Sequence, residues 1–526
     1  MSKHRLHIFR SLVLILLAAL PRDVRAVEPI VYTVKTPAPD THLAEIEATI
    51  PAPAAPSLDL MMPIWTPGFY KVEDYAARVQ DLTARTLAGD PLKLEQTQKN
   101  HWRVALDGTQ VVVLSYRLNC TGRSVTTNSV GEQFALFNPG ATFIVPVDRA
   151  NRTYDIRLEL PPQWRSSITA LDPAADGLAN HYLARDYDTL VDSPILVGNF
   201  TVQEFDVAGS KHVVADAGDL GDWQSARAAE NFKRIVEANA RFWGALPYKR
   251  YVVLNVFRAG AGGLEHRDST LLTSSGKDAT PGGSPRWLSF LSHECFHAYN
   301  VKRLRPVELG PFDYEQPPTT PSLWVSEGLT CYYQDLLLCR AGLSSSDDFL
   351  AAISSFIGGL QTSPGRLRQT LEQSSESVWT GGTSGIGRDN ASTVSYYVKG
   401  PVVGFLLDAH IRRLTAGEKS LDDVMRLAYK RYGGDHGFTP DQFRSTAGEI
   451  AGADLMAWFK SALASTDELD YTEALGWYGL QFPQTASVDN SEKTNPKDAW
   501  KLQHLPAATD LQESHLQALT QSPDRK

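Results

Sequence analysis

Hydrophobic residues alternate with polar ones through the first part of the chain, in short runs that Gly and Pro interrupt. Three of these runs are IVYTV at 30–34, VVVLSYRL at 111–118 and TFIVPV at 142–147. Alternation with a period of two is typical of strands that bury one face, and Gly and Pro mark the turns between strands. The pattern therefore predicts an N-terminal antiparallel β domain over residues 27–215.

The spacing of the hydrophobic positions becomes helical near residue 220. Within 222–243 the apolar positions recur at helical intervals, at Phe232, Ile235, Val236, Phe242 and Trp243. The strand YVVLNVF at 251–257 follows, and from residue 285 to about 464 the pattern is mainly helical. We expect an α+β multidomain protein, with a mixed α/β domain over 216–340 and a mainly helical region over 341–483.

The two ends of the chain differ from the rest. Three basic residues among the first ten precede a short apolar run at 11–20, and Val24-Arg25-Ala26 provides a small-residue cleavage site. This order predicts a secretory signal peptide over 1–26, with an uncleaved anchor as the alternative. We expect an exported protein, periplasmic or secreted, without stable membrane insertion after cleavage. Residues 484–526 are polar and aperiodic, and they predict a disordered tail.

The composition excludes some classes of function. The formal net charge is −9 and no long basic run occurs, so nucleic acid and anionic membranes are not expected partners. The four cysteines, at 120, 295, 331 and 339, are too scattered to form a disulfide framework. Cys331 and Cys339 are predicted to lie about 12 Å apart along one helix, beyond the reach of a disulfide. We expect mostly free, buried thiols.

Residues 293–297 read His-Glu-Cys-Phe-His, which is the H-E-x-x-H pattern. Two helical positions four residues apart lie on one face, so both imidazoles can bind one ion and the intervening Glu can reach its bound water. The Ser-Pro pair at 284–285 suits the start of this helix. The pattern predicts His293 and His297 as zinc ligands and Glu294 as the general base. The alternative is a surface helix with two solvated histidines.

Zinc in a catalytic site takes a third protein ligand and keeps one position open. Glu327 is the lone acid in the first half of an apolar segment, 322–343, that is predicted to form one buried helix. An unpaired buried carboxylate is costly, so a nearby cation is the simplest explanation, with an arginine partner as the alternative. Gly328 weakens the helix and suggests close approach of another backbone. We expect one Zn²⁺ per chain, bound by His293, His297 and Glu327.

Four short segments carry distinctive residues in a fixed order. They are Gly-Gly-Leu-Glu-His at 262–266, HECFHAYNVKRLRP at 293–306, Leu-Trp-Val-Ser-Glu-Gly-Leu-Thr at 323–330 and Ser-Tyr-Tyr-Val-Lys-Gly at 395–400. Together with PIWTPGFYKVEDYAARVQDL at 63–82, they resemble the glycyl aminopeptidase family of gluzincin zinc metallopeptidases. That family is similar in architecture to aminopeptidase N, and the resemblance implies a thermolysin-like catalytic domain after the β domain. The family usually continues into a C-terminal PDZ domain, which the polar tail is not expected to form.

The resemblance also implies roles for residues outside the zinc motif. Glu265 would hold the free amino group of the substrate, and Gly262 and Gly263 would contact the peptide. Tyr397 would stabilise the transition state, with Tyr396 as the reserve candidate. The alternatives are an exposed turn position for Glu265 and a core position for Tyr397.

Several basic residues lie near these motifs. His266 is expected to be structural, because a fourth protein ligand would close the position that water needs. Lys302, Arg303 and Arg305 are expected to form ion pairs or a solvated face rather than contact the substrate. Lys399 has no assigned role.

These observations predict a zinc-dependent aminopeptidase that hydrolyses the N-terminal peptide bond of peptides. A preference for Gly or Ala follows from the resemblance alone. A thermolysin-like zinc endopeptidase and a non-catalytic peptide-binding relative are the two alternatives.

Overall fold

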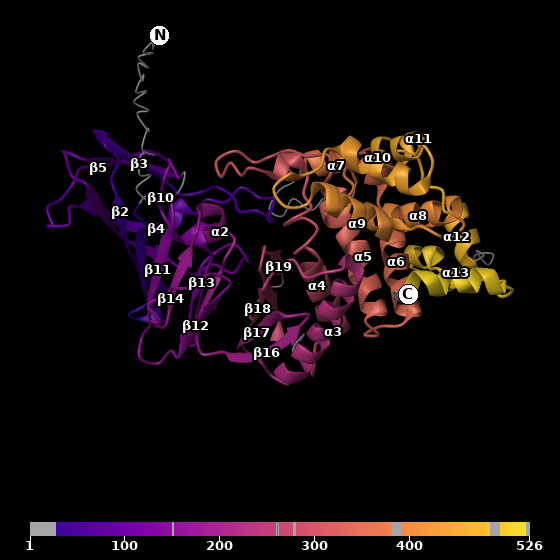
Figure 1. Ribbon diagram of the computed structural model, residues 1–526, viewed down its shortest axis with the longest axis horizontal. Coiled ribbons are helices and arrows are strands. Elements are labelled where there is room, and N and C mark those ends of the chain that lie inside the picture. The colour runs from indigo at the N-terminus through magenta and orange to yellow at the C-terminus, as the bar shows by residue number, and fades with distance from the viewer. Residues whose placement is uncertain are drawn as a thin grey trace, which may run out of the picture.

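The computed structural model describes residues 28–149, 152–258, 260, 262–276, 280–380, 391–483 and 495–521. The predicted signal peptide at 1–26 lies outside the described residues. A β domain occupies one end of the molecule, helices occupy the other, and a mixed sheet lies between them (Figure 1). This arrangement confirms the predicted α+β fold. Among the described residues, no helix has both the length and the apolar character that crossing a bilayer requires.

The β domain contains three sheets. Their strand orders are β13-β14-β11-β1-β2-β7-β4, β10-β3-β6-β5 and β12-β15-β9-β8. The strands are β1 (Ile30–Lys35), β2 (Leu43–Pro51), β3 (Ser57–Met61), β4 (Val79–Arg85), β5 (Leu94–Gln98), β6 (His101–Ala105), β7 (Val111–Asn119), β8 (Ser129–Val130), β9 (Phe134–Phe137), β10 (Val145–Pro146), β11 (Tyr154–Glu159), β12 (Ser166–Thr169), β13 (Asp172–Pro173), β14 (His181–Ala184) and β15 (Ile195–Gly198). Most pairs are antiparallel, as predicted, but β1 and β11 pair in parallel.

Two of the three predicted strands form as expected, and the third does not. Strand β1 buries Ile30, Tyr32 and Val34 on one face, in line with its alternating sequence. The run at 142–147 instead begins with the end of a short helix, α1 (Pro139–Thr142), and only Val145–Pro146 is a strand. Residues 142–146 are buried, and a continuous apolar run does not distinguish a strand from other buried structure.

The central sheet has the order β16-β17-β18-β20-β19. Its strands are β16 (Thr201–Val207), β17 (Ser210–Gly218), β18 (Arg250–Phe257), β19 (Gly262–Glu265) and β20 (Ser269–Ser274). Strands β17, β18 and β20 are parallel, whereas β19 runs antiparallel to β20 at the edge of the sheet. Helices α3 (Ser225–Trp243) and α4 (Pro285–Phe296) pack against this sheet. Edge strand β19 therefore lies beside the helix that carries both histidines.

The remaining helices form the other end of the molecule (Figure 1). They are α5 (Leu329–Arg340), α6 (Ser346–Gln361), α7 (Leu371–Glu376), α8 (Tyr396–Leu414), α9 (Leu421–Tyr432), α10 (Pro440–Ala451), α11 (Met456–Ala464), α12 (Thr472–Tyr478) and α13 (Asp510–Thr520), with a two-stranded sheet of β21 (Leu480–Gln481) and β22 (Gln503–His504); the short helix α2 (Tyr187–Val191) belongs to the β domain. The four cysteines are free thiols, and all but Cys339 are buried.

The predicted disordered tail is wrong for residues 495–521. Helix α13 packs against α12 and α5, with Leu516 and Leu519 buried. The buried Arg340 guanidinium donates to the carbonyl oxygen of Leu519 at 2.9 and 3.1 Å. Tertiary contacts of this kind stabilise a short polar helix that local sequence alone would leave marginal.

Candidate active site

Helix α4 presents two imidazoles to one point. The Ser284 hydroxyl accepts a hydrogen bond from the Trp287 N–H at 3.1 Å, and Pro285 occupies the first position, so the predicted helix start is confirmed. The His297 N–H still donates to the His293 carbonyl at 3.3 Å, which keeps the two side chains one turn apart on one face. Their Nε2 atoms lie 2.9 Å from each other.

Glu327 reaches the same point from a different element. It lies in the π-helical turn Trp324–Gly328, which leads directly into α5. A Cβ on Gly328 would lie 2.7 Å from the Cα of Gly400 in α8, so the predicted close backbone approach is confirmed. Single π-helical turns are frequent at functional sites, and this one directs a carboxylate toward α4.

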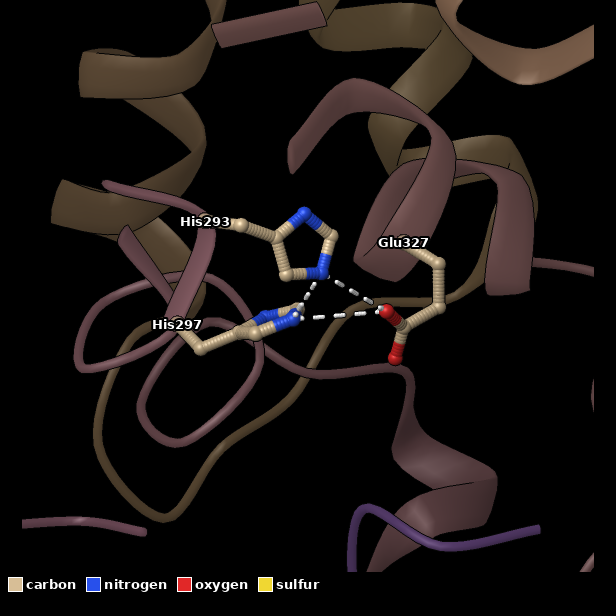
Figure 2. A group of neighbouring side chains, drawn as sticks. All are labelled: His293, His297 and Glu327. Atoms are coloured by element: carbon tan, nitrogen blue, oxygen red, sulfur yellow. Dashed lines mark hydrogen bonds and ion pairs between the residues drawn. The ribbon is translucent and has the colours of Figure 1, made fainter. Parts of the chain in front are cut away.

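Two of the three separations are close to those around one zinc ion, and the 2.9 Å between the two Nε2 atoms is shorter. Glu327 Oε2 lies 3.6 Å from His293 Nε2 and 3.3 Å from His297 Nε2 (Figure 2). A tetrahedral ion with bonds of about 2.0–2.2 Å places its ligand atoms about 3.3–3.5 Å apart. All three side chains are buried, and together they form a possible metal-binding group. The donor set fits Zn²⁺.

Hydrogen bonds on the far side of each ring fix which nitrogen faces the centre. His297 Nδ1 lies 2.7 Å from the carbonyl oxygen of Asn300, and His293 Nδ1 lies 2.8 Å from Oε1 of Gln334. Both partners accept, so each Nδ1 carries the proton and each Nε2 has a lone pair available. Two lone pairs and a carboxylate that face one another are stabilised by a cation.

Glu294 and Glu265 lie beside this group. Oxygens of both carboxylates lie within 4.8 Å of each other and of a His297 nitrogen. Both residues are buried, and each has one oxygen without a hydrogen-bond partner among the described residues. Burial raises the pKa of the Glu294 carboxyl well above its usual range, and the charges of Glu265 and Glu327 act in the same direction. A Cβ on Gly263 would lie 2.2 Å from Glu294 Oε1, so strand β19 touches this carboxylate.

Three tyrosines surround the centre. The Tyr70 hydroxyl, from the β domain, donates to Glu327 Oε1 at 3.3 Å. The Tyr397 ring centroid lies 6.4 Å from that of His293, and Tyr396 packs beside it at 4.7 Å. Burial raises the pKa of all three phenols well above 10, with Glu327 adding to each shift. The hydroxyls therefore remain protonated donors at neutral pH.

Of the nearby basic residues, Lys302 and Arg303 form ion pairs, whereas Arg305 donates to the carbonyl oxygen of Asp435 at 3.3 Å. Lys302 Nζ lies 2.9 Å from Asp192 Oδ1, and Arg303 pairs with Asp268 at 2.7 Å. His266 Nδ1 lies 3.0 Å from the same Asp192 oxygen. Asp192 belongs to the β domain, so this buried cluster ties the two domains together beside Glu265.

Three residues of the site were not anticipated from the sequence. Tyr70 lies within a segment that carried the family resemblance, but nothing in its spacing indicated a contact with the third ligand. Asn300 and Gln334 orient the histidines, and each lies on the same chain segment as a predicted ligand. A search for acceptor side chains two turns after Glu327 would have suggested Gln334, whereas His297 is oriented by the main-chain carbonyl of Asn300, which residue type does not signal.

Comparison with known proteins agrees with this geometry. Residues 31–199 match the Peptidase M61 N-terminal domain, and residues 286–403 match the M61 glycyl aminopeptidase domain. No curated protein matches significantly.

Many solved structures resemble the fold, including the following two. An aminopeptidase N family protein from Idiomarina loihiensis has a TM-score of 0.82 and 26% identity, over 88% of this chain and 80% of that chain. The M1 zinc metallopeptidase from Deinococcus radiodurans has a TM-score of 0.51 and 13% identity, over 84% of this chain and 95% of that chain. The two matched family domains together cover more than half of the sequence. The chain therefore belongs to the M61 glycyl aminopeptidase family and is a zinc metallopeptidase of the aminopeptidase type.

Proposed function

We propose that the protein removes the N-terminal residue of peptides, with one zinc ion per chain bound by His293, His297 and Glu327. The Glu265 carboxylate carries this proposal. It is buried within 4.8 Å of both Glu294 and His297, and its Oε1 has no partner among the described residues. A buried carboxylate in that position matches the cationic amino group of a peptide, and an internal segment of a chain has no such charge.

The protein's own residues would each have a separate role in the reaction. When bound, zinc acts as a Lewis acid and lowers the pKa of a coordinated water to about 7. The unpartnered Oε2 of Glu294 is placed to accept a proton during attack and to return it to the leaving amine. The Tyr397 hydroxyl serves as a donor to the developing negative charge. Gly262 and Gly263 offer the free edge of β19 to the peptide backbone.

The preference for small N-terminal residues is supported by a turn of the β domain. A Cβ on Gly68, whose φ is +96°, would lie 2.4 Å from Glu265 Oε1. Tyr70, two residues later, contacts Glu327. Both residues, with Glu265, also line a cavity of about 550 Å³ between the domains that neither histidine reaches. We take this turn as the wall that limits the N-terminal residue to Gly or Ala.

Metal analysis with an activity panel tests the proposal. Purified protein should contain one zinc per chain and hydrolyse Gly and Ala arylamides faster than Leu arylamide. Activity should disappear on chelation and return with zinc. Acetylated Gly arylamide should resist cleavage. Zinc-loaded protein that cuts none of a broad peptide panel would support a non-catalytic role.

Glu265→Gln separates aminopeptidase from endopeptidase action. The change removes the negative charge and keeps the size, so cleavage of Gly arylamide should fall about 100-fold or more. Glu230→Gln, the same change at an exposed position of α3, is the matched control. If Glu265→Gln retains full activity on both free and blocked peptides, the exopeptidase assignment fails.

We also propose export of the protein to the periplasm or the exterior. The predicted signal peptide supports this location. Expression of the full chain followed by N-terminal sequencing should show a mature protein that begins at Val27. An intact Met1 in the extracellular or periplasmic fraction would contradict cleavage.

A further inference from the structure

Positions along strand β19 indicate where each residue of a bound peptide would lie. Glu265 ends the strand, Gly263 touches Glu294, and Gly262 lies one residue farther on. Each strand residue advances about 3.3 Å, so Gly262 lies about 10 Å from Glu265. If the amino group binds Glu265, the first peptide bond lies beside Gly263 and the second residue beside Gly262. This placement rests on the proposed function.

A second hollow begins where the second residue would lie. It has a volume of about 290 Å³, and its walls include Gly262, Thr273 and Ser274 from the sheet. The α4 side contributes Arg286, Ser289 and Phe290, and Gln334 lies at its base beside His293. The hollow therefore shares Gly262 with strand β19 and Gln334 with the hydrogen bond that orients His293.

Arg286 is the charged residue of this hollow. Of the described residues that line it, no other carries a charge. Arg286 is exposed, and within the described part of the chain its guanidinium has no hydrogen-bond or ion-pair partner. It is the second residue of α4, where the helix dipole already favours anions. A cation adds to this positive potential, at a small cost to the helix.

We propose that Arg286 binds the C-terminal carboxylate of a dipeptide whose amino group binds Glu265. A guanidinium suits a carboxylate through two parallel hydrogen bonds. The second side chain of the dipeptide would lie against Phe290. The preferred substrates are then short peptides with a free carboxyl terminus, and the two charged ends of an extended dipeptide lie at most about 7 Å apart.

The test compares Gly-Phe with its C-terminal amide, Gly-Phe-NH₂. Binding is measured by calorimetry in the Glu294→Gln background, so that no hydrolysis occurs, and kcat/KM is measured in the parent enzyme. The Glu294→Gln protein should bind Gly-Phe about tenfold more tightly than the amide. Adding Arg286→Gln should bring the ratio of these two affinities close to one. Arg241→Gln, an exposed arginine of α3, is the matched control and should keep the ratio.

The outcomes separate this inference from the function on which it rests. An equal preference for Gly-Phe in the parent and in Arg286→Gln would overturn the role of Arg286, even if Gly-Phe is hydrolysed. Hydrolysis of neither peptide, with a binding preference that depends on Arg286, would overturn the catalytic proposal and leave the carboxylate site intact. If the protein with Arg286 intact binds Gly-Phe and Gly-Phe-NH₂ equally tightly, the proposal of a carboxylate site is wrong.

Discussion

At the scale of single residues, the metal site depends on groups that never touch the ion. His297 is oriented by a backbone carbonyl, which substitution cannot remove, whereas His293 is oriented by the side chain of Gln334. The Gln334 amide is itself held by donation to Ser289 Oγ at 2.9 Å and Asp335 Oδ2 at 3.1 Å. The His293 tautomer can therefore be tested by changing one residue.

Gln334→Met should weaken zinc binding about 10- to 100-fold, because the side chain keeps its length but loses the acceptor for His293 Nδ1–H. Competition with a chelator measures this affinity. Gln334→Glu retains an acceptor and is the control. Unchanged zinc affinity in Gln334→Met would show that the ring is held by packing alone.

His212 provides a pH-dependent contribution to stability that is remote from the metal. Burial lowers its pKa from 6.5 to about 4, and its ring stacks on Phe205 at 5.0 Å. The unfolded chain therefore binds the extra proton first, so stability is present above pH 6.5 and is lost as the pH falls toward 4. Between pH 7 and 4.5 the loss should be about 2–3 kcal/mol. Urea unfolding at both pH values measures it, and His212→Phe should lose correspondingly less.

At the scale of elements, one crossing of two helical segments positions the third ligand. The π-helical turn Trp324–Gly328 and α8 meet through Gly328 and Gly400, with no side chain between them. The contact places Glu327 toward α4 and Tyr397 beside His293 in a single arrangement. Any increase in the separation of these segments would move both residues.

Gly328→Ala should therefore lower both stability and zinc affinity. Its Cβ would lie 2.7 Å from a backbone atom, which cannot move aside as a flexible side chain could. A destabilisation of about 1–3 kcal/mol is expected, measured by thermal unfolding of the metal-free protein. Gly476→Ala in α12 meets nothing within 4 Å and should be neutral or slightly stabilising. If Gly328→Ala and Gly476→Ala changed stability equally, the close contact between the two segments would not be the cause of the loss.

Elements that follow short-range sequence patterns were predictable from the sequence. The start of α4 at Ser284, the spacing in α3 and the alternation in β1 all follow short-range rules. Helix α13 was not predicted, although Thr509 and Gln512 form a capping box, because its stability comes from contacts with α5 and α12. The parallel pairing of β1 with β11 joins residues more than a hundred positions apart, and no local pattern encodes it.

The active-site residues also separate into those that local sequence predicts and those that depend on tertiary contacts. The H-E-x-x-H spacing identifies two ligands because both lie on one helix, and Gly328 indicated a close approach. Tyr70 could not be derived, since its contact with Glu327 depends on how two domains dock.

At the scale of the whole molecule, a buried charge cluster joins the β domain to the central sheet. Asp192 accepts from Lys302 at 2.9 Å and from the Arg267 N–H at 2.6 Å, and it lies 3.0 Å from His266. Burial opposes ionisation of Asp192, but the charge of Lys302 lowers its pKa well below 3.8. The contribution is present at neutral pH and is lost as the pH falls below about 4.

Asp192→Asn should destabilise the protein by about 3–5 kcal/mol at pH 7, because it leaves Lys302 buried without its counter-charge. Differential scanning calorimetry at pH 7 measures the loss. Asp172→Asn, at an exposed position in β13, is the control. The difference between Asp192→Asn and the parent should shrink in acid. A constant difference across pH would show that the charge of Asp192 is not the source.

The turn that holds Gly68 and Tyr70 has a further consequence for biosynthesis. It is translated long before the zinc motif, yet it completes the surroundings of Glu265 and Glu327 only when the β domain has docked. Until that docking occurs, the site lacks Gly68 beside Glu265 and the Tyr70 donor to Glu327. Completion of the active site therefore depends on domain docking as well as on folding of the catalytic domain.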